Sequence, residues 1–245
     1  MNAFLKTPPE SEETTEDAAE KLIQEGVSGV GGFSLLFGRV GRDWMKGKGM
    51  TEKEHRTGLA IVSNRSTDLH SVKWLCSERN ETHALSNSHY GDMSWPKVVK
   101  AEQAVCEAVK LAVTAHETKD ALIQRFLDIL SHDSLPPRGD GEEWDIYLNQ
   151  LRHSVFVRTI GRKEQREIDD LKKAHEVMNG LTNSHVDLPI PEATHGVYGT
   201  QKQSIIMVDK EGKVTFFERT LFDVDGCPVK KGEGDKIFEF QIENW

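Results

Sequence analysis

The spacing of apolar residues changes twice along this 245-residue chain. Short or alternating apolar runs come first, helix-length amphipathic stretches follow, and alternating runs return near the end. Grouped runs of each kind, rather than a strict alternation of strand and helix, predict an α+β fold with antiparallel sheets. The predicted strands are residues 33–40, 59–64, 72–76, a weaker 82–87, 155–157, 204–209, 214–218 and 237–242.

Three helices are predicted from caps and from the helical period. The first begins where Thr14 and Asp17 have the spacing of a capping box. The second begins near Pro96, because proline is favoured in the first turn of a helix. The third begins near Thr118. The predicted inward residues are Val98, Val105, Val109 and Ala112 on the second helix, and Leu122, Phe126, Ile129 and Leu130 on the third.

The composition excludes several classes of protein. Hydrophobic residues make up 37% of the chain and the formal net charge is -9, which makes it a poor electrostatic partner for nucleic acid or anionic membrane. No apolar run approaches the ~18 residues of a membrane-spanning helix, and no apolar leader follows Met1. No two of the three cysteines have the CxxC spacing, which favours a reducing cytosolic setting.

The charge pattern divides the chain. Residues 10–20 hold six acidic side chains and no basic one. Such a segment has too little apolar surface to bury for it to become ordered. We therefore expect an acidic disordered tail at residues 1–20 and a single domain over residues 21–245. A charged helix at residues 161–180 and a proline-containing loop after it predict an insertion at about residues 161–195.

Two glycine-rich motifs resemble phosphate-binding loops only in part. The glycines between residues 29 and 32 come before a predicted strand, which is the reverse of the order in a dinucleotide site. The segment around Lys48 lacks the GxxxxGK spacing and the following Ser or Thr. Both are predicted to be loops.

Serine and histidine cluster between residues 83 and 89. Ser86, Ser88 and His89 include a nucleophile and a base, but no GxSxG surrounds the serines, so local hydrogen bonding is the favoured role. His83 and His89 have no carboxylate or thiolate partner at a ligand spacing, and no metal site is predicted.

Three motifs occur in order along the chain. The first is Leu85-Ser86-Asn87 with Trp95-Pro96-Lys97 at a helix start, the second is Tyr198-Gly199-Thr200 before Ile205-Ile206-Met207-Val208-Asp209, and the third is Gly212-Lys213-Val214-Thr215-Phe216 with Glu218-Arg219. The terminal Phe238-Glu239-Phe240 also fits. Through these motifs the chain, over about residues 32–245 apart from the insertion, resembles the transport and Golgi organisation protein 2 family, also called the NRDE family.

The resemblance carries expectations for fold and function. It implies an N-terminal-nucleophile hydrolase-like sandwich of antiparallel sheets with flanking helices. It implies a role in Golgi organisation, protein secretion and haem or acyl-lipid trafficking, with haem or an acyl-CoA-type molecule as ligand and secretory-pathway proteins as partners. It implies a cytoplasmic, Golgi-associated or mitochondrial location.

The start of the chain departs from the family pattern. Family members open with Met-Cys and then carry Asn-Arg-Asp-Glu, whereas this chain opens with Met1-Asn2, and Gln201 replaces an arginine of the family. An N-terminal nucleophile uses its own free amine as base and must be the first residue of the mature chain. Met1-Asn2 cannot supply such a nucleophile. We therefore expect an N-terminally incomplete, non-catalytic member. The alternatives are an amidohydrolase whose nucleophile lies in an upstream segment, and an acidic protein-interaction module.

Four small polar residues in the matched motifs are candidates for a ligand site. Ser86, Asn87, Thr200 and Ser204 lie at strand ends, where a pocket rim needs hydrogen-bond donors. The alternative is that they only cap turns. An incomplete sheet also makes residues 33–40 an apolar edge strand, which predicts self-association through that edge.

Overall fold

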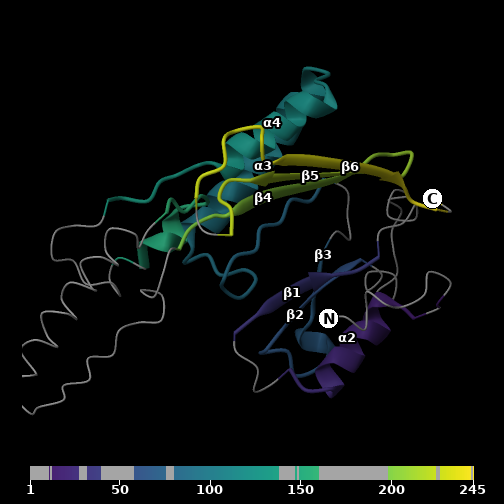
Figure 1. The fold of residues 1–245 in the computed structure, drawn as a ribbon. Helices are drawn as coiled ribbons and strands as arrows, with labels where there is room; N and C mark the ends of the chain where they lie inside the picture. The colour runs from purple at the N-terminus through teal and green to yellow at the C-terminus, as the bar shows by residue number, and fades with distance from the viewer. Residues whose placement is uncertain are drawn as a thin grey trace, which may run out of the picture. The chain divides into compact units, whose positions relative to one another are not determined.

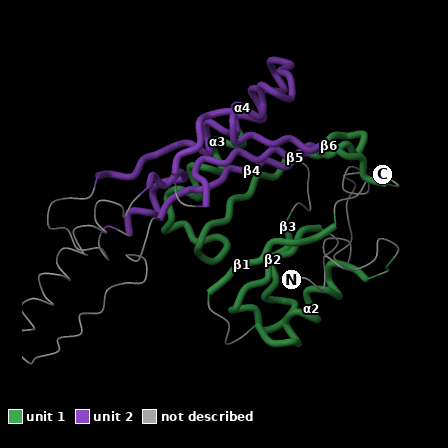
Figure 2. The backbone as a smooth tube through the Cα atoms, viewed as in Figure 1, with its two compact units in different colours: residues 1–106, 208–214, 240–245 green, residues 107–207, 215–239 purple. Residues whose placement is uncertain are grey.

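The computed structural model describes residues 11, 13–27, 32–39, 58–75, 80–137, 147, 149–159, 198–224, 227–243 and 245. Figure 1 shows their helices and strands. The chain divides into two compact units (Figure 2). Unit 1 holds residues 1–106, 208–214 and 240–245, and unit 2 holds residues 107–207 and 215–239.

The first sheet has the order β1-β2-β3 and is antiparallel. Its strands are β1 Ser34–Phe37, β2 Leu59–Ser63 and β3 Lys73–Leu75, inside the predicted ranges. The register pairs Ser34 with Ser63 and Leu36 with Ile61. A short 3-10 helix, η3 Leu69–Ser71, lies between β2 and β3 and is capped by the side chain of Asp68.

Helix α2, Thr15–Gln24, packs against this sheet (Figure 1). The predicted capping box is confirmed, because the Thr14 side chain accepts from the Asp17 N–H and the Asp17 side chain accepts from the Thr14 N–H. The shared core consists of Ala19, Val27, Ala60, Val62 and Val72. The helix therefore begins inside the segment 1–20 that we expected to be a tail.

Two predicted strands are wrong. Residues 82–87 have no strand partner, and the residues around 155–157 are irregular. In the second segment the backbone groups bind outside any ladder: the Phe156 N–H donates to the His132 carbonyl at 3.0 Å, and the Val157 N–H donates to the Thr200 hydroxyl at 2.9 Å. A loop carbonyl and a side-chain hydroxyl thus accept the hydrogen bonds of backbone N–H groups that we expected to pair within a sheet.

Helices α3, Pro96–Thr114, and α4, Lys119–Leu130, begin where we predicted. The Thr118 hydroxyl caps α4 by accepting from the Ala121 N–H at 3.3 Å. The predicted inward faces are wrong in part. Val109 is 40% exposed, and the buried helix residues are Ala108, Ala112, Ile123 and Leu127.

The second sheet has the order β4-β5-β6. Its strands are β4 Lys202–Val208, β5 Lys213–Thr220 and β6 Asp235–Gln241. The predicted hairpin between residues 204–209 and 214–218 is confirmed, with the Asp209 N–H donating to the Lys213 carbonyl at 3.0 Å. Ile205 and Phe217 pack against Ile123 and Leu127 of α4.

The α+β class with antiparallel sheets is confirmed. A further 3-10 helix, η4 Asn149–His153, precedes the irregular residues around 155–157. The expected tail residues 1–10, both glycine-rich loops apart from Gly32, and the expected insertion at residues 161–195 lie outside the described residues. Of the helices that the structure describes, none is long and apolar enough to cross a membrane.

Candidate functional site

A pocket of about 480 Å³ lies in unit 1, at the end of the first sheet where β1 begins and β2 ends. The register that pairs Ser34 with Ser63 brings the two strand ends together. The described residues that line the pocket are Gly32, Phe33, Ser34, Ser63, Asn64, Arg65, Ser86, Asn87, Ser88 and His89.

The turn after β2 forms one wall of this pocket. The Ser66 N–H donates to the Ser63 carbonyl at 2.9 Å, and the Ser63 N–H donates to the buried Ser66 hydroxyl at 3.0 Å. The Asn64 Oδ1 accepts from the Phe33 N–H at 3.5 Å, which ties the turn to the start of the neighbouring strand. These local bonds leave Arg65 on the exposed side of the turn.

The segment 86–89 forms the facing wall. The Ser34 hydroxyl donates to the Ser88 carbonyl at 3.3 Å, linking β1 to this segment. The Ser88 hydroxyl donates to Asp92, which also accepts from the Ser94 N–H and hydroxyl. Chiefly because Ser88 donates to it, and with the help of Ser94, the pKa of Asp92 falls to about 2. Asp92 is thus an ionised anchor for this wall near neutral pH.

The serine and histidine cluster is not arranged as a nucleophile with its base. Ser88 Oγ donates to the Asp92 carboxylate, whose pKa of about 2 makes it a weak base. This agrees with the local hydrogen bonding that we predicted. His83 has both ring nitrogens engaged, Nε2 by Glu81 at 3.0 Å and Nδ1 by the Tyr90 hydroxyl at 2.8 Å.

Within the described part of the chain, no three histidine, cysteine or carboxylate side chains form a group that could hold a metal ion. His89 lines the pocket, and its Nδ1 lies 3.9 Å from the Asp92 Oδ2. One imidazole is too few ligands for a structural metal centre.

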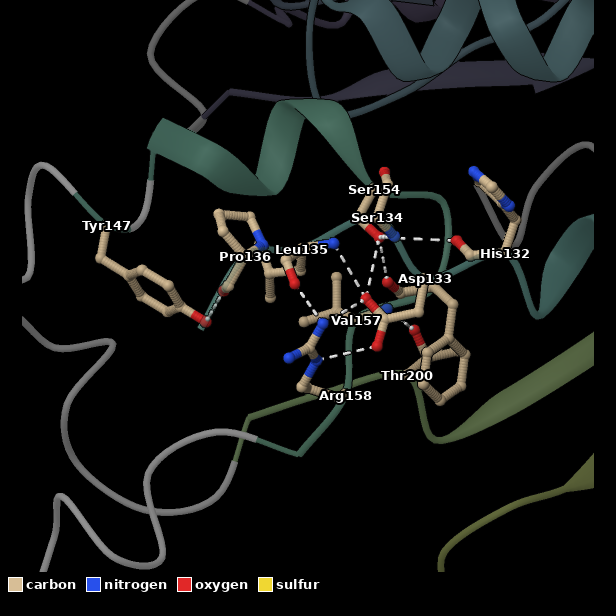
Figure 3. Close-up of polar contacts among 11 residues, drawn as sticks. His132, Asp133, Ser134, Leu135, Pro136, Tyr147, Ser154, Val157, Arg158 and Thr200 are labelled. Atoms are coloured by element: carbon tan, nitrogen blue, oxygen red, sulfur yellow. Dashed lines mark hydrogen bonds and ion pairs between the residues drawn. The ribbon is translucent and has the colours of Figure 1, made fainter. Parts of the chain in front are cut away.

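Two of the four predicted site residues line the pocket, and two do not. Ser86 and Asn87 are lining residues in unit 1. Thr200 belongs to unit 2, where its hydroxyl accepts from the Val157 N–H and its own N–H donates to the Val157 carbonyl at 2.8 Å (Figure 3). Ser204 is exposed on β4.

Thr200 takes part in a polar cluster around Ser154 (Figure 3). Ser154 is fully buried, accepts from the Ser134 N–H at 2.9 Å and donates to the Phe156 carbonyl at 2.5 Å. Arg158 pairs with Asp133 through two bonds of 2.8 and 3.0 Å and lowers the pKa of that carboxyl. These contacts hold the segment before β4 in place.

Sequence reasoning missed Arg65 and the strand-end residues Ser34, Ser63 and Asn64 as pocket residues. A usable signal was present, since Asn64-Arg65-Ser66 is a polar turn directly after an apolar strand. The pairing of the two strand ends depends on the sheet register, which the sequence alone does not determine.

The pocket suits some ligand groups better than others. Phe33 is the sole apolar side chain among the described lining residues. A porphyrin ring or an acyl chain needs predominantly apolar walls. The polar lining therefore does not fit the body of haem or of an acyl chain, and it fits the polar end of either ligand.

The fold and this pocket define an α+β protein with a polar pocket and, among the described residues, no metal centre. The family model described as transport and Golgi organisation 2 matches residues 1–223. The chain therefore belongs to the transport and Golgi organisation 2 family. The match includes the first 31 residues, where we expected no resemblance, and ends before β6. No curated protein matches the chain.

Proposed function

We propose that this chain is a non-catalytic member of its family that acts in Golgi organisation and protein secretion by carrying an acyl-CoA-type or haem ligand. The pocket at the end of the first sheet carries this proposal. Ser86 and Asn87 line it, and both come from a motif on which the resemblance to the family rests.

Two considerations support the finer parts of the proposal. The hydroxyl of Ser88 is engaged by a carboxylate of low pKa rather than by a competent base, which favours binding over catalysis. Because the lining is polar, an acyl-CoA-type ligand, with its phosphates, is favoured over haem. Family membership supports a fold of the N-terminal-nucleophile hydrolase-like sandwich class and a cytoplasmic place of action, next to Golgi or mitochondrial membranes.

The test is rescue in cells depleted of this protein. Golgi morphology and the secretion of a reporter are measured after re-expression of the full chain or of a Ser86→Ala/Asn87→Ala double variant. The wild-type chain should restore both readouts and the double variant should restore neither. Gln103→Ala, an exposed amide on α3, is the control that should rescue fully. Rescue by the double variant, or none by the wild type, would reject the proposal.

A further inference from the structure

The pocket at the end of the first sheet has a charge of one sign. Among its described lining residues, Arg65 is the permanently charged side chain, and none is Asp or Glu. Arg65 is exposed, and no described group pairs with its guanidinium. In a chain with a net charge of -9, an arginine that lines a pocket and has no partner among the described residues is available to an anionic ligand.

Local hydrogen bonds turn the polar lining into a set of donors. The Asn64 Oδ1 is used by the Phe33 N–H, so the amide NH2 of Asn64 remains to donate. The Ser63 hydroxyl accepts from the Arg65 N–H at 3.2 Å, which leaves its proton to donate. The side chains of Ser86 and Asn87 have no hydrogen-bond partner among the described residues.

The carboxylate next to the pocket, Asp92, is held by the wall of the pocket. Asp92 accepts three hydrogen bonds, from the hydroxyls of Ser88 and Ser94 and from the Ser94 N–H. Three acceptor sites of this carboxylate are therefore used within the wall of the pocket, and Asp92 is not among the described lining residues.

We propose that the pocket is an oxyanion site, in which the Arg65 guanidinium pairs with a phosphate or carboxylate group while Asn64, Ser86 and Asn87 donate hydrogen bonds to it. This inference rests on the proposed function and names the part of the ligand that the pocket recognises. The planar guanidinium matches either oxyanion through two parallel N–H bonds. In an acyl-CoA-type ligand the group is a phosphate, and in haem or a fatty acid it is a carboxylate.

Isothermal titration calorimetry with the full chain distinguishes a phosphate ligand from a carboxylate ligand. The probes are coenzyme A, inorganic pyrophosphate and laurate, each titrated into the wild type, Arg65→Gln, Arg65→Lys and Arg152→Gln. Arg152 is an exposed arginine of unit 2 and serves as the charge-matched control. If the ligand group is a phosphate, coenzyme A and pyrophosphate should bind to Arg65→Gln about 10- to 100-fold more weakly than to the wild type, since a charged hydrogen bond is lost. If the ligand group is a carboxylate, laurate should show this loss instead. Arg65→Lys should be intermediate.

Each outcome has one meaning. Equal affinities for Arg65→Gln and Arg152→Gln overturn the oxyanion site, and so does the absence of binding by all three probes. Thermal unfolding of Arg65→Gln should match the wild type, because the side chain is exposed. If a probe binds through Arg65 but the wild-type chain fails to rescue depleted cells, the proposed function falls and the oxyanion site stands.

Discussion

The indole of Trp245 packs directly on Gly212, in the turn between β4 and β5, so that a Cβ at position 212 would overlap the ring. The Trp245 Nε1 donates to the Lys210 carbonyl at 3.0 Å, and the Ile242 N–H donates to the Gly212 carbonyl at 3.0 Å. Gly212 also has a φ of +82°, a conformation that side chains rarely adopt. Gly212 thus provides both the backbone conformation of the turn and the space in which Trp245 packs.

Replacement of this glycine separates the two effects. Gly212→Ala should lower the free energy of unfolding by more than ~2 kcal/mol, since left-handed strain costs roughly 1–2 kcal/mol and the overlap with Trp245 adds to it. Gly232→Ala is the matched control, because Gly232 has a φ of +93° and nothing within 4 Å of an added Cβ. Denaturant unfolding measures both. Equal losses for the two variants would show that Trp245 does not pack here.

The pair of Arg219 and Asp235 predicts an acid-sensitive contact between β5 and β6. Arg219 is 9% exposed, and its guanidinium donates to the two oxygens of Asp235 at 2.8 and 2.7 Å. This bonding lowers the pKa of Asp235. The stabilisation is complete above the unfolded-state pKa of about 3.9 and is lost as the pH falls through the lower folded-state value.

Asp235→Asn should therefore reduce the free energy of unfolding by about 2 kcal/mol at pH 7, between the values typical of surface and buried pairs. Its stability should also fall less steeply than that of the wild type below pH 4. Glu218→Gln, which breaks the more exposed pair with Lys202, is the control and should cost less than ~1 kcal/mol. Identical acid profiles for Asp235→Asn and the wild type would contradict the assignment.

The elements that the sequence predicted well are those with local signals. Thr14 and Thr118 cap α2 and α4 within three residues of their partners, so spacing alone identifies them. The residues around 155–157 do not form the predicted strand because their backbone groups bind distant loops or side chains, as Val157 does with Thr200. Residues 82–87 have no strand partner. Propensity contains no information on such partners.

The same reasoning applies to the candidate site. Ser86 and Asn87 belong to a local sequence motif, whereas Ser34 and Ser63 become neighbours only through the register of β1 on β2. Arg65 lies outside the three motifs that the sequence contains, so the motifs do not indicate it as a pocket residue. The sequence therefore indicates the pocket residues that belong to a local motif. It does not indicate those that only long-range strand pairing brings together.

Ser154 predicts a large effect from the loss of one hydroxyl. It is fully buried and bonds both the Ser134 N–H and the Phe156 carbonyl (Figure 3). Ser154→Ala leaves both groups without this partner, so we expect a loss of about 2 kcal/mol in the free energy of unfolding. The same substitution at Ser204, which is exposed on β4, should change it by less than ~0.5 kcal/mol. A similar effect at both positions would be inconsistent with the cluster.

Asp92 predicts a titration far from the usual carboxylate range. The donors Ser88 and Ser94 hold its pKa at about 2. The carbon-13 shift of its side-chain carboxyl, followed by NMR, should stay constant from pH 7 to pH 4 and change only near pH 2. A Ser88→Ala/Ser94→Ala variant should raise the midpoint toward about 3.9. A wild-type midpoint near 4 would mean that these serines do not anchor the pocket wall.

The first sheet predicts self-association. β1 pairs with β2 on one side, and no described strand pairs with it on the other. Leu36 of this strand is 45% exposed. An apolar edge of this kind offers backbone groups to a second chain, so we expect oligomers by size-exclusion chromatography with light scattering. Leu36→Lys should shift the population toward the 27.6 kDa monomer, because a charged side chain on an edge strand disfavours pairing between chains. Val113→Lys, an exposed position on α3, should leave the oligomers unchanged. A wild-type chain that elutes as a monomer at all concentrations would show that this edge is not free to pair.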